Sequence, residues 1–151
     1  MQDLIISPYT QKDHDPVIFL WDQCHLIVPW NDPNKDIQRK LQECPDQFFL
    51  ARQHDLVIGS CMAGYDDHRG WFYYLGVLPK FRHQGVAGQL IAHGETLLTR
   101  LGCSKINLMV RQSNTEVIQF YKKNGYGQDP VMVMNKRLES DIKIQVSPPP
   151  L

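Results

Sequence analysis

The feature that most constrains the fold is a strand, turn and helix that follow one another in the middle of the chain. Residues 70–77 are mostly apolar or aromatic and predict a strand, and a basic turn leads from there to Gly85. From Gly85 to Leu101 apolar residues recur at helical spacing, and Gly102 follows as the glycine that commonly ends a helix. We expect a helix about 25 Å long whose apolar face packs on a sheet.

Local patterns on both sides of this segment predict the other elements. Two helices follow an N-terminal strand, a hairpin precedes the central strand, and a strand, a helix and a last strand complete the order. The expected strands are 4–7, 48–53, 56–63, 106–110 and 131–137, and the expected helices are 10–28, 32–44 and 113–124. This order predicts an α/β (α+β) fold in which a mixed sheet carries helices on both faces.

Length and composition place the chain among compact globular proteins. With 151 residues, of which 42% are hydrophobic and 21% charged, there is room for one domain but not for two. We expect that domain over residues 1–146, and a disordered tail over residues 147–151 because three consecutive prolines exclude helix and central strand. Lys plus Arg and Asp plus Glu both number 16, so no overall field attracts a nucleic acid.

Targeting and metal-binding signals are missing from the sequence. The first residues contain neither the basic nor the apolar region of a signal peptide, and no stretch reaches the ~18 apolar residues that a membrane span requires. We therefore expect a cytoplasmic protein without a membrane partner. Because the cysteines are far apart and form no Cys-x-x-Cys motif, we expect reduced thiols and no metal site. The four are Cys24, Cys44, Cys61 and Cys103.

The turn before the long helix has the properties of a phosphate-binding site. The first amides of a helix lack partners within the helix, and the helix dipole adds about half a positive charge there. Gly85 has no side chain to block a ligand, and the small Ala87 and Gly88 let a diphosphate approach the backbone. The alternative is that the glycines only allow close packing on the sheet. The pattern is neither Walker A nor Gly-x-Gly-x-x-Gly.

This turn resembles the coenzyme A signature of the GNAT superfamily of acyl-CoA N-acyltransferases, Arg/Gln-x-x-Gly-x-Gly/Ala. The signature is formed here by Arg82, His83, Gln84, Gly85, Val86 and Ala87. The end of the family's fourth strand and an Asn...Tyr-x-x-x-Gly element also match, in the right order and spacing. They are Leu75, Gly76, Val77, Leu78 and Pro79, followed by Asn114, Phe120, Tyr121, Gly125 and Tyr126. Residues 29–33 and 65–70 are similar to elements of the small bacterial YpeA-type acetyltransferases.

The resemblance implies a GNAT fold whose strands 4 and 5 are parallel and splayed, so that a slot opens between them. It also implies a bulge in the fourth strand near Tyr74, Leu75 and Gly76, which frees backbone groups for the thioester and the pantetheine. The residues that the resemblance assigns to coenzyme A are Leu75, Gly76, Val77, Arg82, His83, Gln84, Gly85, Val86, Ala87, Gly88 and Asn114.

Tyr121 matches the tyrosine that donates a proton to the coenzyme A thiolate in this family. Because Val117 lies one helical turn before it, a plain core aromatic is the alternative. The resemblance implies that Trp30 and Asn31 border the acceptor groove, although a tryptophan there also suits a helix staple. No residue stands out as the general base. Polar residues near the fourth strand that we consider for contact with the acceptor are Asp66, His68 and Tyr74.

The resemblance and the chemistry of acyl transfer together predict an N-acetyltransferase that uses acetyl-CoA. An amine must lose a proton and attack a thioester carbonyl, and the leaving sulfur then needs a proton. We expect direct attack by a primary amine, carried by a small molecule or a peptide, in a monomer or homodimer. Two alternatives stay open: an acyl-CoA-binding sensor or catalytically silent GNAT domain, and a structural domain whose glycine turn only serves packing.

Overall fold

The computed structural model describes residues 3–141, so the tail predicted over residues 147–151 lies outside the described residues. The strands are β1 (Leu4–Pro8), β2 (Phe48–Gln53), β3 (Leu56–Tyr65), β4 (Gly70–Val77) and β5 (Ile106–Asn107). The helices are α1 (His14–Gln23), α2 (Pro33–Glu43), α3 (Val86–Arg100) and α4 (Thr115–Lys123), with short 3-10 turns η1 (Gln11–Asp13), η2 (Pro45–Gln47) and η3 (Pro79–Phe81). Over residues 3–141, no helix has the length and apolar character needed to cross a membrane.

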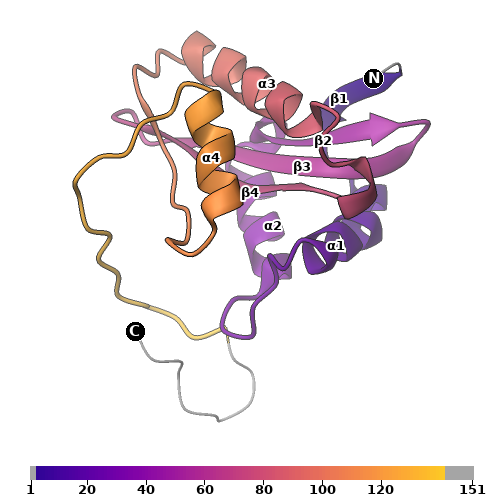
Figure 1. Cartoon of the computed structure of the whole chain (residues 1–151). Coiled ribbons are helices and arrows are strands. Elements are labelled where there is room, and N and C mark those ends of the chain that lie inside the picture. Colours follow the sequence, from indigo (N-terminus) through magenta and orange to yellow (C-terminus); the bar gives the residue numbers. More distant parts are fainter. Residues whose placement is uncertain (1–2, 142–151) are drawn as a thin grey trace.

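A single sheet in the order β1-β2-β3-β4-β5 separates two layers of helices (Figure 1). Helices α3 and α4 cover one face, where Leu90, Leu98 and Tyr121 pack in one apolar cluster. Helices α1 and α2 cover the other face, where Trp21 and Ile37 belong to a second cluster. Strands β1 to β4 are antiparallel and β4 pairs with β5 in parallel. The predicted mixed sheet with helices on both faces is therefore confirmed.

Strands β4 and β5 separate soon after they meet. Their parallel pairing consists of two register positions, Gly70 with Ile106 and Trp71 with Asn107. From Phe72 onward β4 has no strand partner on this side within the described part of the chain. Strand pairing therefore ends well before β4 does, as expected for splayed strands, and the unpaired edge of β4 from Phe72 to Val77 marks the position of the expected slot.

Helices α1, α3 and α4 each end at a residue with a left-handed backbone. These residues are His25, Gly102 and Gly125, with φ of +57°, +92° and +90°. The two glycines confirm the predicted ends of α3 and α4. After α1, the Leu26 amide donates to the carbonyl of Trp21 at 2.9 Å, a bond typical of such an end. The predicted continuation of α1 to residue 28 is wrong, because a histidine takes the conformation that glycine usually signals.

The strand predicted over residues 131–137 is wrong. This segment has no strand pairing in the described structure, and the side chains of residues 131–134 are between 62% and 87% exposed. The pattern reflected β propensity, but a strand also needs a neighbouring edge that accepts its hydrogen bonds. Strand β5, predicted over residues 106–110, provides only two paired residues.

Close contact between α3 and the sheet depends on Gly94. A Cβ atom at this position would lie 2.5 Å from Cε1 of Phe72 and 3.3 Å from Cζ of Phe49. In the interior of a helix, replacing glycine with alanine normally stabilises the folded protein. Here we expect Gly94→Ala to lower the free energy of unfolding by about 1–3 kcal/mol, because the added methyl group overpacks the core.

Thermal denaturation of two separate variants, Gly94→Ala and Gly88→Ala, tests this expectation. A Cβ atom at Gly88 in the same helix would meet only the Asn124 side chain, at 4.0 Å. Gly88→Ala should therefore leave the melting temperature unchanged or raise it, whereas Gly94→Ala should lower it. Equal melting temperatures for the two variants would contradict the close contact of α3 with β4.

Candidate active site

The turn between β4 and α3 presents free backbone amides at the open end of the slot. Gly85 is the N-cap of α3, and no side chain caps the helix there. Among the described residues, no group accepts a hydrogen bond from the amides of residues 83–88. Gly85 has φ of +83°, and a Cβ atom there would meet nothing within 4 Å. The turn thus forms an open, electropositive nest of the kind that binds phosphate.

The side chains of the signature hold the turn in place. Nε of Arg82 donates to the carbonyl of Val77 at 3.0 Å, and the guanidinium also reaches the sulfur of Cys24 at 3.8 Å. The thiol of Cys24 donates to the same Val77 carbonyl at 3.3 Å, and burial raises its pKa. The His83 ring is exposed, 3.7 Å from the carboxylate of Glu116 in α4. Arg82 therefore fastens the turn to the end of β4, and the backbone amides are the groups left open.

Strand β4 carries the expected bulge. Ser60 of β3 pairs with Gly76, but Met62 pairs with Tyr73, so that two residues of β4 lie opposite the single Cys61. Tyr74, one of the two, has φ of +53°. A bulge interrupts the ladder and turns backbone groups away from it. The interruption lies on the stretch of β4 that has no partner strand on its other side.

Helix α4 carries Tyr121 into the core beside the slot. Its side chain is 7% exposed and packs in the same cluster as Val77 and Val86, which flank the turn. Burial raises the pKa of Tyr121, so the phenol stays protonated at neutral pH. Its hydroxyl makes no hydrogen bond within the described residues. Tyr121 is thus a core aromatic with a free proton donor, which fits both interpretations of the sequence.

Asn114 serves as the N-cap of α4. Its side-chain oxygen accepts a hydrogen bond from the amide of Val117 at 3.3 Å. The side chain is exposed, and the contact that the structure gives it is local. A capping residue of this type stabilises a helix by about 1 kcal/mol. The position therefore fixes the start of the helix that carries Tyr121.

On the opposite face of the sheet, three polar side chains meet beside the bulge. The Tyr74 hydroxyl donates to Oδ2 of Asp36 at 2.5 Å, and Nδ2 of Asn31 donates to the same oxygen at 2.7 Å. Burial, together with the Asp36 carboxylate, raises the pKa of Tyr74. Asn31 and Tyr74 were predicted from the sequence, and Trp30 is half-buried in the same connection between α1 and α2. Asp36 was missed, because an acidic residue in the first turn of a helix is ordinarily explained by the helix dipole.

The two other predicted acceptor residues lie in a separate loop. The Asp66 carboxylate accepts hydrogen bonds from the amides of Arg69 and His68 at 2.6 and 2.9 Å. It also accepts one from the indole of Trp71 at 3.3 Å, and these hydrogen bonds lower its pKa. The His68 side chain is exposed. Asp66 thus shapes the loop before β4, and the structure does not bring it together with Asn31 and Tyr74.

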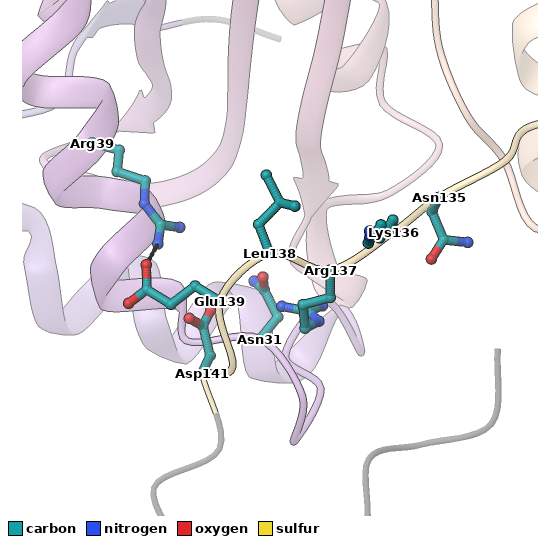
Figure 2. A pocket seen from close by; sticks show the side chains of 8 residues that line it. All are labelled: Asn31, Arg39, Asn135, Lys136, Arg137, Leu138, Glu139 and Asp141. Atoms are coloured by element: carbon teal, nitrogen blue, oxygen red, sulfur yellow. Dashed lines mark ion pairs between the residues drawn. The ribbon is translucent and has the colours of Figure 1, made fainter.

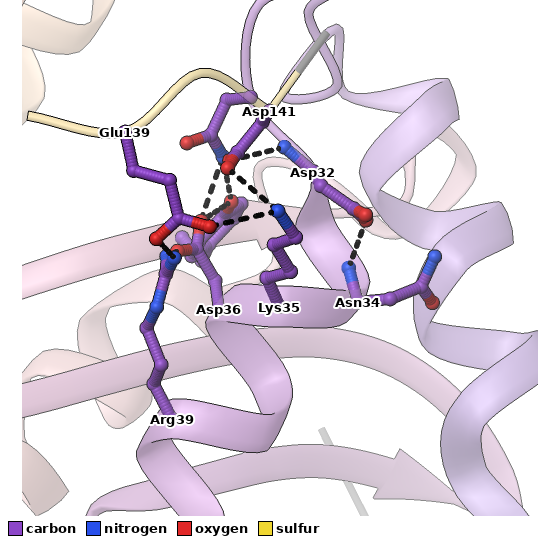
Figure 3. Close-up of polar contacts among 9 residues, drawn as sticks. Asp32, Asn34, Lys35, Asp36, Arg39, Glu139 and Asp141 are labelled. Atoms are coloured by element: carbon purple, nitrogen blue, oxygen red, sulfur yellow. Dashed lines mark hydrogen bonds and ion pairs between the residues drawn. The ribbon is translucent and has the colours of Figure 1, made fainter. Parts of the chain in front are cut away.

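The end of the described chain lies beside Asn31 and the start of α2. Residues 135–139 and Asp141 line a hollow of about 440 Å³ together with Asn31 and Arg39. Figure 2 shows these side chains. The side chain of Asp141 is 3% exposed. One of its oxygens accepts from the Asp32 amide at 2.9 Å, and the other from Nζ of Lys35 at 3.4 Å (Figure 3). These contacts join residues more than 100 positions apart, so no local sequence signal predicted them.

Similarity to known proteins decides the family. A model of the acetyltransferase (GNAT) family matches residues 15–126. The chain belongs to the GNAT acetyltransferase family. It is 49% identical over 137 residues to an acetyltransferase of Sodalis glossinidius (strain morsitans), covering 90% of this chain and 96% of that protein. An acetyltransferase of Pectobacterium atrosepticum is 47% identical over 136 residues, with the same shares covered.

Solved structures show that the GNAT fold is shared. The aminoglycoside acetyltransferase AAC(6')-Iy, in complex with a bisubstrate analogue of coenzyme A, matches with a TM-score of 0.73. The match covers 89% of this chain and 98% of that one at 24% identity, a level that establishes the fold. The predicted GNAT fold is therefore confirmed, and the family match together with the acetyltransferase relatives confirms the predicted enzyme class. The parallel pair β4 and β5 takes the place that the resemblance assigned to the family's splayed strands.

Proposed function

We propose that this GNAT chain transfers the acetyl group of acetyl-CoA to a primary amine by direct attack in a ternary complex. The observation that carries the proposal is the set of free amides at the start of α3, which opens onto the slot beside the bulge. Acetyl-CoA supplies the acetyl group as an activated thioester. The open space at Gly85 fits a phosphate group against the backbone.

The proposed roles of the cofactor residues follow from their places along the slot. The backbone from Arg82 to Gly88 binds the diphosphate, with the Arg82 side chain holding the turn. Leu75, Gly76 and Val77 hold the pantetheine along the unpaired edge of β4. Amides in the bulge donate to the thioester oxygen and stabilise the negative charge that develops there. Asn114 contributes by fixing α4 against the slot.

Tyr121 is proposed to give its proton to the leaving sulfur. We expect Tyr121→Phe to lower turnover by about 10²-fold, the usual contribution of a positioned acid, while leaving the dissociation constant of acetyl-CoA nearly unchanged. Steady-state kinetics and titration calorimetry measure the two quantities. Tyr126→Phe is the matched control, since that ring packs on Tyr121 but its hydroxyl is bonded to Glu95 at 3.1 Å. Unchanged turnover in Tyr121→Phe would remove Tyr121 from the mechanism.

The acceptor is proposed to be an amine on a small molecule or a peptide, entering beside Asn31 and Tyr74. The neighbouring Asp36 carboxylate, which also pairs with Arg39 at 3.2 Å, offers a charged hydrogen-bond acceptor to an amine that arrives as an ammonium ion. Structural neighbours include an aminoglycoside acetyltransferase and a ribosomal-protein-S18-alanine N-acetyltransferase. Enzymes with this fold are thus named for small-molecule acceptors and for protein acceptors. We further propose a cytoplasmic monomer or homodimer whose single domain spans residues 1–146.

A panel of primary amines, incubated with acetyl-CoA and assayed for released thiol, tests the function. Thiol release with one class of amine supports the proposal and identifies the acceptor. Binding of acetyl-CoA without thiol release from any amine would favour the acyl-CoA sensor. Absence of a thermal shift with acetyl-CoA or CoA would favour a structural domain, because a bound ligand stabilises the native state.

A further inference from the structure

Tyr74 is held in a backbone conformation that tyrosine rarely adopts. Its φ of +53° lies in the left-handed region, and the residue is part of the bulge opposite Cys61. Such a conformation is strained for a bulky residue and persists only where the surroundings impose it. The contacts around Tyr74 must therefore supply that constraint.

Two fully buried residues, one from α1 and one from β3, contact Tyr74. The hydroxyl of Ser60 donates to the carbonyl of Tyr74 at 2.7 Å, and the indole of Trp21 donates to the same hydroxyl at 2.9 Å. The Trp21 ring also stacks on the Tyr74 ring, with centroids 3.9 Å apart. Because the hydroxyl accepts one bond and donates another, its orientation is determined.

Packing alone does not explain the hydroxyl of Ser60. The residue is 0% exposed in the middle of β3, where alanine would fill nearly the same volume. The hydroxyl instead fixes the direction of the Tyr74 carbonyl. Since a peptide unit is planar and trans, the amide of Leu75 then points the opposite way, away from β3. That is the side on which β4 has no partner strand and the slot opens.

We infer that Ser60 is a positioning residue for acetyl transfer, with Trp21 orienting its hydroxyl. Ser60 fixes the peptide between Tyr74 and Leu75 so that the Leu75 amide faces the slot and donates to the thioester oxygen. The inference rests on the proposed function and adds to it the internal support of the bulge. Without this hydroxyl, the strained peptide is free to rotate, and the amide loses its alignment.

The test uses acetyl-CoA labelled with ¹³C at the acetyl carbonyl and follows the NMR resonance of that carbon. A hydrogen bond to the oxygen moves this resonance downfield, so the complex with the wild-type chain should differ from free acetyl-CoA. In Ser60→Ala the bound resonance should move back toward the free value, while the dissociation constant of CoA, which has no acetyl group, stays close to that of the wild type. Turnover with an accepted amine should fall by about tenfold or more.

Ser7→Ala is the matched control. It removes a hydroxyl that accepts a hydrogen bond from Arg52 at 2.8 Å on β1, at the far edge of the sheet. This variant should keep the wild-type resonance and turnover. If Ser60→Ala fails to fold, Trp21→Phe replaces it. The phenylalanine keeps a ring against Tyr74 but removes the hydrogen bond to Ser60. In this variant the bound resonance should move toward the free value by a smaller amount.

The outcomes separate the inference from the function on which it rests. A wild-type resonance and wild-type turnover in the folded Ser60 or Trp21 variant would overturn the positioning role and leave the proposed function intact. A wild-type chain that binds neither acetyl-CoA nor CoA would overturn the function itself. If Ser60→Ala weakened the binding of CoA and of acetyl-CoA equally and left the bound resonance unchanged, the role of Ser60 would be structural, and the positioning role would be overturned.

Discussion

Gly85→Glu should abolish the binding of acetyl-CoA. The substitution places a carboxylate in the open nest formed by the amides of residues 83–88, where it fills the space and repels a diphosphate. In a thermal shift experiment, a ligand at about 100 times its dissociation constant adds about 2.7 kcal/mol to the stability of the chain that binds it. The wild type should show this gain with acetyl-CoA, and Gly85→Glu should show none.

A substitution at a second glycine tests whether backbone strain alone, rather than the blocked nest, accounts for a loss of binding. Gly102 has φ of +92°, close to the +83° of Gly85, and a Cβ atom there also meets nothing within 4 Å. Gly102→Glu therefore adds the same charge and a similar strain at the far end of α3, and it should keep the full thermal shift. Retained binding in Gly85→Glu would place the cofactor elsewhere on the molecule.

Asp13→Ala should lower the free energy of unfolding by about 3–5 kcal/mol, the usual cost of breaking a buried ion pair. The Asp13 side chain is 4% exposed, and its oxygens accept two hydrogen bonds from Arg52, both at 2.7 Å. They also accept hydrogen bonds from the amide and hydroxyl of Thr10, the N-cap of η1, at 2.7 and 2.9 Å. Without the carboxylate, the Arg52 guanidinium is left partly buried and unpaired.

Denaturant unfolding at neutral pH measures this loss, and Asp15→Ala provides the comparison. Asp15 is nearby in α1, but its side chain is 99% exposed and, within residues 3–141, pairs only with His14. An exposed pair of this kind contributes less than about 1 kcal/mol. Similar losses in the two variants would contradict a special contribution from the buried pair.

The contribution of Asp13 should also depend on pH. Burial alone would raise the pKa of Asp13, but the hydrogen bonds from Arg52 and Thr10 outweigh it and lower the pKa to about 2. Because the pKa in the folded chain is below the ordinary value, the stabilisation is complete above about pH 4 and disappears as the pH falls toward 2. The difference between the wild type and Asp13→Ala should narrow over this window. A constant difference would mean that the carboxylate does not titrate as described.

Features that depend on neighbouring residues were predictable from the sequence. Gly102 and Gly125 end their helices as expected, and the turn at Gly85 opens where the helical pattern begins. Features that depend on distant contacts were not. Asp141 reaches the Asp32 amide across 109 positions, and the left-handed His25 ends α1 without a glycine. Such contacts are decided by tertiary packing, which local propensity does not contain.

The candidate site shows the same division. The glycine signature located the turn, but it did not indicate that Arg82 would turn back to the carbonyl of Val77 and leave the start of α3 without a side-chain cap. The polar loop before β4 suggested Asp66, whose carboxylate is occupied by that loop's own amides. Asp36 and Ser60 carry no motif, and they matter only because the fold places them against Tyr74.

Two register positions join β5 to β4, so strand pairing contributes little to holding α4 on the four antiparallel strands. Packing holds it there, because Tyr121 lies in the apolar cluster of α3 and the Tyr126 hydroxyl, just after α4, donates to Glu95 of α3 at 3.1 Å. The position of Tyr121 relative to β4 therefore depends on side-chain contacts with α3 rather than on the sheet.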